Sequence, residues 1–208
     1  MICFSDTDIL LKLIAFGLLK QALAALGVTS AKEVYVTPEA ASKCRASKRE
    51  RTGFRQEVLN QALDYLKQMT TITQPGDTDE LNQLLDLDDE GIDAGETALF
   101  LATKDQSEFI LITSDKRALR TLTNNFLSQE LHHRHLGRVL CLESILLLLI
   151  KHKGFPAIRL QLLAGLNYDM AVRNALRDGD ATEEEFIAAL NRYVTRLDEE
   201  TQGLLMKV

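Results

Sequence analysis

The chain has 208 residues, 46% of them hydrophobic, which is enough for one medium-sized α/β domain with an appendage but cramped for two. The net charge of −6 and pI near 5.3 exclude nucleic-acid binding through global positive charge and leave only local basic patches for that role. Three scattered cysteines without a Cys-x-x-Cys pair predict neither a disulfide framework nor a zinc ribbon, and favour the cytoplasm. We expect no signal peptide and no membrane span, because the apolar run at 145–150 is far too short.

Short apolar strands alternate with helical patterns through the first part of the chain. Strands are predicted at residues 2–4, 33–36, 109–113 and 138–142, with a strand or a turn at 70–73. Helices are predicted at residues 9–26, 78–87, 94–104, 116–124 and 143–151, and helical patterns run from residue 38 to about residue 69. This alternation predicts an α/β domain over residues 1–152.

The remaining residues, 153–208, predict a helical C-terminal extension. Thr182 and Glu185 form a capping-box pattern that starts a long amphipathic helix. Its apolar stripe contains Phe186, Ile187, Leu190, Val194 and Leu197. We expect the stripe to dock on the α/β core, and the alternative is a surface for a homodimer or another protein.

Three acidic residues, Asp6, Glu96 and Asp115, lie where apolar sequence gives way to a helical pattern. A parallel sheet can gather such residues at one edge, where their charges would repel unless a hard divalent cation were bound. Ligands that are all oxygens favour Mg²⁺ or Mn²⁺. Each acid, however, also stands where a helix N-cap is expected, and Asp93 with Glu96 resembles a capping box.

Four motifs follow one another along the α/β region: Asp6-Thr7-Asp8-Ile9-Leu10, Gly95-Glu96 before Ala98-Leu99, Ile112-Thr113-Ser114-Asp115-Lys116, and Val139-Leu140-Cys141-Leu142-Glu143. Their order and spacing resemble those of the PIN-domain nucleases over about residues 1–152. The resemblance implies a three-layer α/β/α PIN-like domain with a central parallel sheet. It also implies catalytic, metal-binding carboxylates at Asp6, Glu96 and Asp115, oriented by Thr7 or Ser114. The implied activity is Mg²⁺- or Mn²⁺-dependent hydrolysis of phosphodiester bonds, in RNA more often than in DNA.

One position departs from the family's pattern. A further acid usually stands in the helix after the second strand, where this chain has Lys43, and Glu39 comes too early. Unless Asp8 or Asp93 substitutes, the departure predicts weak metal binding or an inactive PIN-like module that binds nucleic acid or protein. Since many PIN nucleases are toxins restrained by an antitoxin, the resemblance also implies a toxin-like role with an antitoxin-like protein partner.

Residues 43–55 form a basic stripe within an otherwise acidic chain. The stripe contains six Lys and Arg residues and only one acid, Glu50. Its candidate nucleic-acid contacts are Arg45, Lys48, Arg49 and Arg51. The alternative is a solvated helix face without a ligand.

Two further patterns offer other functions. Asp6-x-Asp8 after a short strand also resembles the first motif of the haloacid dehalogenase superfamily, in which the first Asp is a nucleophile in phosphoryl transfer. That alternative, a phosphatase, leaves Glu96 unexplained. The cluster at residues 132–135 contains three histidines but lacks companion ligands at useful spacing for a transition metal.

Overall fold

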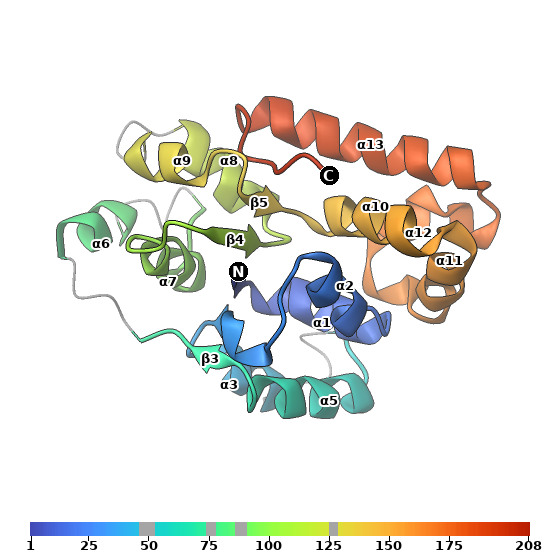
Figure 1. Cartoon of the computed structure of the whole chain (residues 1–208), viewed down its shortest axis with the longest axis horizontal. Helices are drawn as coiled ribbons and strands as arrows, with labels where there is room; N and C mark the ends of the chain where they lie inside the picture. Colours follow the sequence, from blue (N-terminus) through green and yellow to red (C-terminus); the bar gives the residue numbers. More distant parts are fainter. Residues whose placement is uncertain (46–52, 74–77, 86–90, 125–128) are drawn as a thin grey trace.

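The computed structural model describes residues 1–45, 53–73, 78–85, 91–124 and 129–208 (Figure 1). Five parallel strands form one sheet in the order β3-β2-β1-β4-β5, with β1 at its centre. The strands are β1 (Ile2–Ser5), β2 (Val34–Val36), β3 (Thr70–Thr71), β4 (Phe109–Ile112) and β5 (Val139–Leu140). The predicted α/β class with a parallel sheet is therefore confirmed, and the ambiguous segment near residue 70 is a strand.

Helices cover both faces of this sheet. Those of the α/β region are α1 (Thr7–Ala15), α2 (Leu19–Ala25), α3 (Ala40–Arg45), α5 (Gln56–Leu66), α6 (Thr78–Leu85), α7 (Ala94–Ala102), α8 (Lys116–Asn124), α9 (Gln129–His135) and α10 (Leu142–Lys153). The extension adds α11 (Phe155–Ala164), α12 (Met170–Ala175) and α13 (Glu183–Glu200). Within the described residues, no helix has the length and apolar character needed to cross a membrane.

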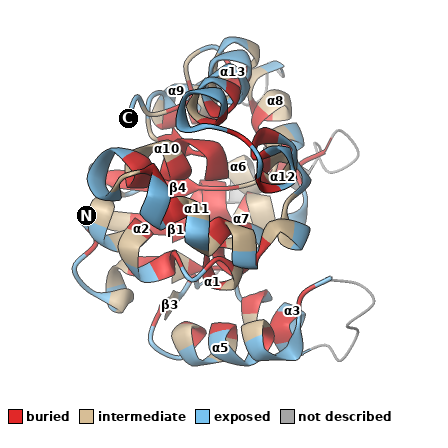
Figure 2. Ribbon diagram, turned by 90° about the vertical axis from the view of Figure 1, so that its right-hand side faces the viewer, coloured by how far each residue is buried: buried red, intermediate tan, exposed pale blue. Residues whose placement is uncertain are grey.

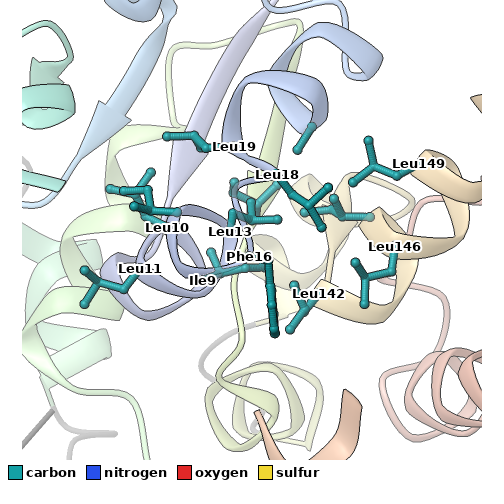
Figure 3. Packing of buried hydrophobic residues seen from close by; sticks show 14 of the residues in the cluster. Ile9, Leu10, Leu11, Leu13, Phe16, Leu18, Leu19, Leu142, Leu146 and Leu149 are labelled. Carbon is teal, nitrogen blue, oxygen red and sulfur yellow. The ribbon is translucent and has the colours of Figure 1, made fainter. Parts of the chain in front are cut away.

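The strands alternate their side chains between two hydrophobic clusters, one on each face of the sheet. Cys3 points into a cluster with α1, α2, α5 and α10, whereas its neighbour Phe4 points into a cluster with α7 and α8. Ile110 and Leu111 divide in the same way on β4. Because the sheet is buried on both sides, its central strands are almost wholly apolar. Figure 2 shows this buried interior, and Figure 3 shows residues of α1, of the turn after it, of α2 and of α10 packed in one cluster.

The single helix predicted at residues 9–26 is wrong, because the structure divides it into α1 and α2. Gly17 adopts a positive φ of 68°, which a glycine reaches without steric cost. Its N–H donates to Ile14 O (2.9 Å), and Leu18 N–H donates to Leu13 O (2.7 Å), the pair of bonds that defines a Schellman motif. The turn satisfies the last carbonyls of α1, so the apolar pattern continues across it while the helix does not.

The C-terminal extension packs on the α/β core. Phe186 and Leu190 of α13 belong to the cluster on one face, and Leu197 belongs to the cluster on the other. After α13 the chain returns along β5, where Val139 N–H donates to Leu204 O (3.1 Å) and Met206 N–H donates to Val139 O (2.8 Å). The apolar stripe thus docks as expected, and the tail covers the outer edge of β5.

Helix α9 was not predicted, and it places a histidine in the core. The ring of His135 is fully buried between Phe100 and Phe109, with centroid distances of 5.4 Å and 5.3 Å. Its Nδ1 lies 2.7 Å from Leu131 O and therefore carries the ring proton in the neutral form. Burial lowers the pKa of His135 to about 4, although the bond to Leu131 opposes that shift.

This histidine makes the protein sensitive to acid. The pKa of His135 is lowered by burial to about 4 in the folded state from the ordinary value of 6.5, so the unfolded chain binds the extra proton first. Its stabilising contribution is present above about pH 6.5 and is lost as the pH falls toward about 4. We expect the free energy of unfolding to drop by roughly 2–3 kcal/mol between about pH 7.5 and pH 4.5 from this residue.

Urea unfolding of the wild-type protein and of His135→Gln across this pH range checks the expectation. The Gln variant retains polar groups but cannot take up the proton, so its stability should change less with pH. Parallel pH profiles for the two proteins would contradict the assignment.

Candidate active site

The strand order reverses at β1, since β2 and β3 lie on one side of it and β4 and β5 on the other. In open α/β sheets, ligands bind at the carboxyl ends of the strands beside such a reversal. Asp6 directly follows β1, and Asp115 follows β4 after Thr113 and Ser114. The two strand ends are joined directly, because Asp6 N–H donates to Ile112 O (3.0 Å).

Asp6 is held by groups from both strand ends. Its Oδ1 accepts a hydrogen bond from Asp8 N–H (3.0 Å), which caps α1. Its Oδ2 accepts from Ser114 N–H and Ser114 Oγ (both 3.3 Å) and from Thr113 Oγ1 (3.4 Å). Burial raises the pKa of Asp6, and the backbone donors of Asp8 and Ser114 oppose the rise. The carboxylate is therefore held in a fixed orientation, and its burial disfavours the charged form.

Glu96 belongs to a capping box at the start of α7. Asp93 Oδ1 accepts from Gly95 N–H (2.7 Å) and Glu96 N–H (3.0 Å), while Glu96 Oε2 accepts from Asp93 N–H (2.8 Å). Burial and the hydrogen-bonded, negatively charged Asp93 raise the pKa of Glu96 to about 8, and the charge of Asp115 adds to the rise. The hydrogen bond with Glu96 lowers the pKa of Asp93. Glu96 thus holds its proton more tightly than an ordinary glutamate, and Asp93 holds its proton less tightly than an ordinary aspartate.

Asp115 caps the next helix at the same edge. Its Oδ1 accepts from Arg117 N–H (2.8 Å) and Ala118 N–H (2.9 Å) at the start of α8. Its own N–H donates to Thr113 Oγ1 (3.0 Å), the hydroxyl that contacts Asp6. Asp6 and Asp115 therefore cap helices, and Glu96 completes the capping box of Asp93, as the helix-cap alternative expected. These acids are also near one another. The Asp6 carboxylate and the backbone N–H of Asp115 both bond Thr113 Oγ1, and the charge of Asp115 contributes to the raised pKa of Glu96.

Lys43 brings a cation into this region. It lies on α3, which follows β2, and β2 pairs with β1 so that Val36 stands beside Ser5. Burial raises the pKa of Asp6 and the charge of Lys43 opposes that rise, whereas for Asp93, whose pKa is lowered chiefly by its hydrogen bond with Glu96, the charge of Lys43 adds to the lowering. A lysine thus acts electrostatically on two carboxylates of the site, at the position where the PIN pattern has an acid.

The other basic candidates divide into two groups. Arg45 is exposed at the end of α3, close in sequence to Lys43. Lys48, Arg49 and Arg51 lie outside the described residues. Their proposed contacts to nucleic acid therefore stay predictions.

The donor atoms at this edge of the sheet are carboxylate and hydroxyl oxygens. Among the described residues, no three His, Cys, Asp or Glu side chains are grouped so as to hold a metal ion, and this includes the three histidines of α9. The chemistry of the acidic set nevertheless fits Mg²⁺ or Mn²⁺, since every donor is an oxygen. Thr7 and Thr97, directly after Asp6 and Glu96, have buried hydroxyl groups without a hydrogen-bond partner in the described protein. Such hydroxyls suit a site for a polar ligand.

A fourth carboxylate at this edge was not selected from the sequence. Glu143 follows β5 at the start of α10, where it is almost fully buried, and its Oε1 lies 2.5 Å from Lys116 Nζ. Lys116 also lies over the ring of Tyr193 on α13, with Nζ 5.4 Å from the centroid. The sequence offered only a weak signal for this pair: an acid directly after the last predicted strand.

Comparison of the chain with protein-family models, with curated proteins and with solved structures found no match. The likeness to PIN domains therefore rests on the motifs and their order. The fold and the site define a broader class: an α/β protein whose central parallel sheet carries acidic residues at its topological switch point.

Proposed function

We propose that this protein is a PIN-like, divalent-metal-dependent nuclease that hydrolyses phosphodiester bonds in single-stranded RNA. The observation that supports the proposal most strongly is that Thr113 Oγ1 contacts both the Asp6 carboxylate and the backbone N–H of Asp115 at the switch point, while the charge of Asp115 acts on Glu96. These acids come from three separate segments, and capping alone does not require the segments to meet.

In this proposal Asp6, Glu96 and Asp115 would hold Mg²⁺ or Mn²⁺. A bound ion would lower the pKa of a water molecule and stabilise negative charge on the scissile phosphate. The protein's own groups set the geometry: Ser114 and Thr113 hold Asp6 Oδ2, and the backbone of α8 holds Asp115 Oδ1. Arg45 is exposed near this edge and supplies positive charge for the phosphate backbone.

In this proposal Lys43 lowers the affinity for the metal ion, because its positive charge already favours the anionic forms of Asp6 and Asp93. Lys43→Glu restores an acid where the PIN pattern has one. We expect this variant to bind Mn²⁺ about 10–100-fold more tightly than the wild-type protein, by calorimetry in Mn²⁺ titrations. Lys43→Gln serves as the control and should show a smaller gain, because it removes a charge without adding a ligand. Unchanged affinity in Lys43→Glu would contradict the placement of Lys43 beside the metal ligands.

The proposed activity is tested with labelled single-stranded RNA, its DNA counterpart and an RNA duplex. Each is incubated with the purified protein in Mg²⁺, in Mn²⁺ and in EDTA. The proposal expects metal-dependent cleavage of the single-stranded RNA and no cleavage in EDTA. Absence of cleavage with either metal would contradict it.

A second candidate is supported by the helix caps. Because Asp6, Asp93 and Asp115 all satisfy helix N-termini, the same residues suit a non-catalytic PIN-like module that binds nucleic acid or protein. Such a module requires no metal, and binding of RNA without cleavage would favour it. An antitoxin-like partner and a homodimer stay predictions under either function.

A further inference from the structure

A small pocket lies beside the proposed site, between α3, α5 and the strands β2 and β3. Its volume is about 250 Å³, and its walls include Val36, Leu63 and Leu66. Pockets for drug-sized ligands span roughly 300–1,000 Å³, so this one suits a smaller unit. It lies at the same sheet edge as Asp6, because β2 pairs with β1 and neighbouring strands lie only about 5 Å apart.

A buried hydroxyl in the pocket wall has no hydrogen-bond partner among the described residues. Thr37 lines the pocket directly after β2, and its side chain is only 4% exposed. Its Oγ1 finds no partner in the part of the chain that the structure describes. Since leaving a buried polar group unpaired costs about 1–3 kcal/mol, this hydroxyl is suited to bond a ligand that enters the pocket.

The rim of the pocket is basic. Arg45 and Lys67 both line it and are both exposed. Arg45 forms no ion pair with the described residues, and Lys67 pairs only with the exposed Asp64 (2.7 Å), a contact that contributes little in water. Apolar side chains together with the hydroxyl groups of Thr37 and Thr71, below a positive rim, match a nucleobase and the phosphates that flank it.

We propose that this pocket takes one unpaired base of the RNA strand, next to the phosphate at the acidic site. Thr37 Oγ1 bonds the edge of the base, the apolar wall contacts its face, and Arg45 and Lys67 contact the flanking phosphates. Bases in a duplex are stacked and paired, so only single strands can insert one. This inference rests on the proposed nuclease function, which it deepens by giving the preference for a single strand a structural basis and by naming a source of base preference.

Binding of fluorescent RNA oligonucleotides in EDTA tests the pocket without cleavage. The probes are single strands that differ at one base and a duplex of equal length. Ala41→Leu fills the pocket from α3, and Ala24→Leu makes the same change in a separate surface pocket beside α2. Thr37→Val removes the hydroxyl at nearly constant shape, and because that hydroxyl bonds none of the residues that the structure describes, the fold should keep its stability.

We expect the wild-type protein to prefer the single strand, and Ala41→Leu to weaken that binding by at least about 10-fold, on the scale of 1–3 kcal/mol per recognised base. Thr37→Val should reduce the difference between bases, and Ala24→Leu should bind as the wild type does. Equal binding by Ala41→Leu, equal affinity for the duplex, or no binding by the wild type would overturn the inference.

Cleavage assays in Mg²⁺ or Mn²⁺ separate this inference from the proposed function. Binding that needs an open pocket, without any cleavage, supports the pocket and contradicts the nuclease. Cleavage whose rate and cut positions are the same in Ala41→Leu supports the nuclease and contradicts the pocket.

Discussion

The Asp6→Asn variant is expected to lose RNA cleavage by on the order of 10²–10³-fold while keeping wild-type stability. Asn caps a helix about as well as Asp, so the bond to Asp8 N–H at the start of α1 is retained. The substitution removes the negative charge that attracts a divalent cation and leaves a neutral, weaker oxygen ligand. Initial cleavage rates with Mg²⁺ and thermal unfolding midpoints, measured on the same preparations, check both parts.

Two further variants separate the role of these acids in helix capping from their proposed role in catalysis. Glu96→Gln keeps the capping box of α7, because Gln also serves at the third helical position. Asp6→Ala removes both functions of Asp6 and should lose activity together with about 1 kcal/mol of stability. If Asp6→Asn cleaves as fast as the wild type, the acid serves only as a cap.

Lys116→Met is expected to destabilise the protein by about 3–5 kcal/mol, because it leaves Glu143 buried without its cation. The loss reflects the uncompensated charge more than the strength of the ion pair. Lys116→Met combined with Glu143→Leu should recover most of the stability, since an apolar pair of similar size replaces a partly buried ion pair. Urea unfolding of the three proteins gives the comparison.

This pair also ties the extension to the site. Lys116 follows Asp115 and contacts Tyr193, while Lys12 of α1 pairs with Asp169 before α12 (2.9 Å).

A loss of stability below about 1 kcal/mol in Lys116→Met, which is typical of exposed ion pairs, would contradict the burial of Glu143.

The sequence predicts the sheet well because its signal is local. Buried strands of a parallel sheet are short apolar runs, and the runs at β1 and β4 lie between helical patterns. The break at Gly17 was missed because apolar residues continue on both sides of it. Helix α9 was missed because its two inward positions, Leu131 and His135, are separated by exposed or half-exposed polar residues.

At the candidate site, local sequence patterns do not distinguish between the possible roles of the residues. An acid between a strand and a helix looks the same in sequence whether it caps the helix or binds a metal, and in this fold the caps are present. The effect of Lys43 on Asp6 and Asp93 depends on where α3 lies against β1, which the sequence does not specify. The orphaned hydroxyl of Thr37 also becomes visible only once the pocket is formed.

The central claim is that the acids at the switch point perform chemistry beyond capping. The most direct test measures the cleavage rate of labelled single-stranded RNA in Mg²⁺ for the wild type, Asp115→Asn and Asp178→Asn. Asp178 is an exposed acid of the extension that pairs loosely with Arg173 (3.7 Å), so it controls for the same change of charge. Our account predicts full activity in Asp178→Asn and at least about a 100-fold loss in Asp115→Asn, with all three proteins equally stable. Equal rates in all three proteins, or no cleavage by any of them, would contradict it.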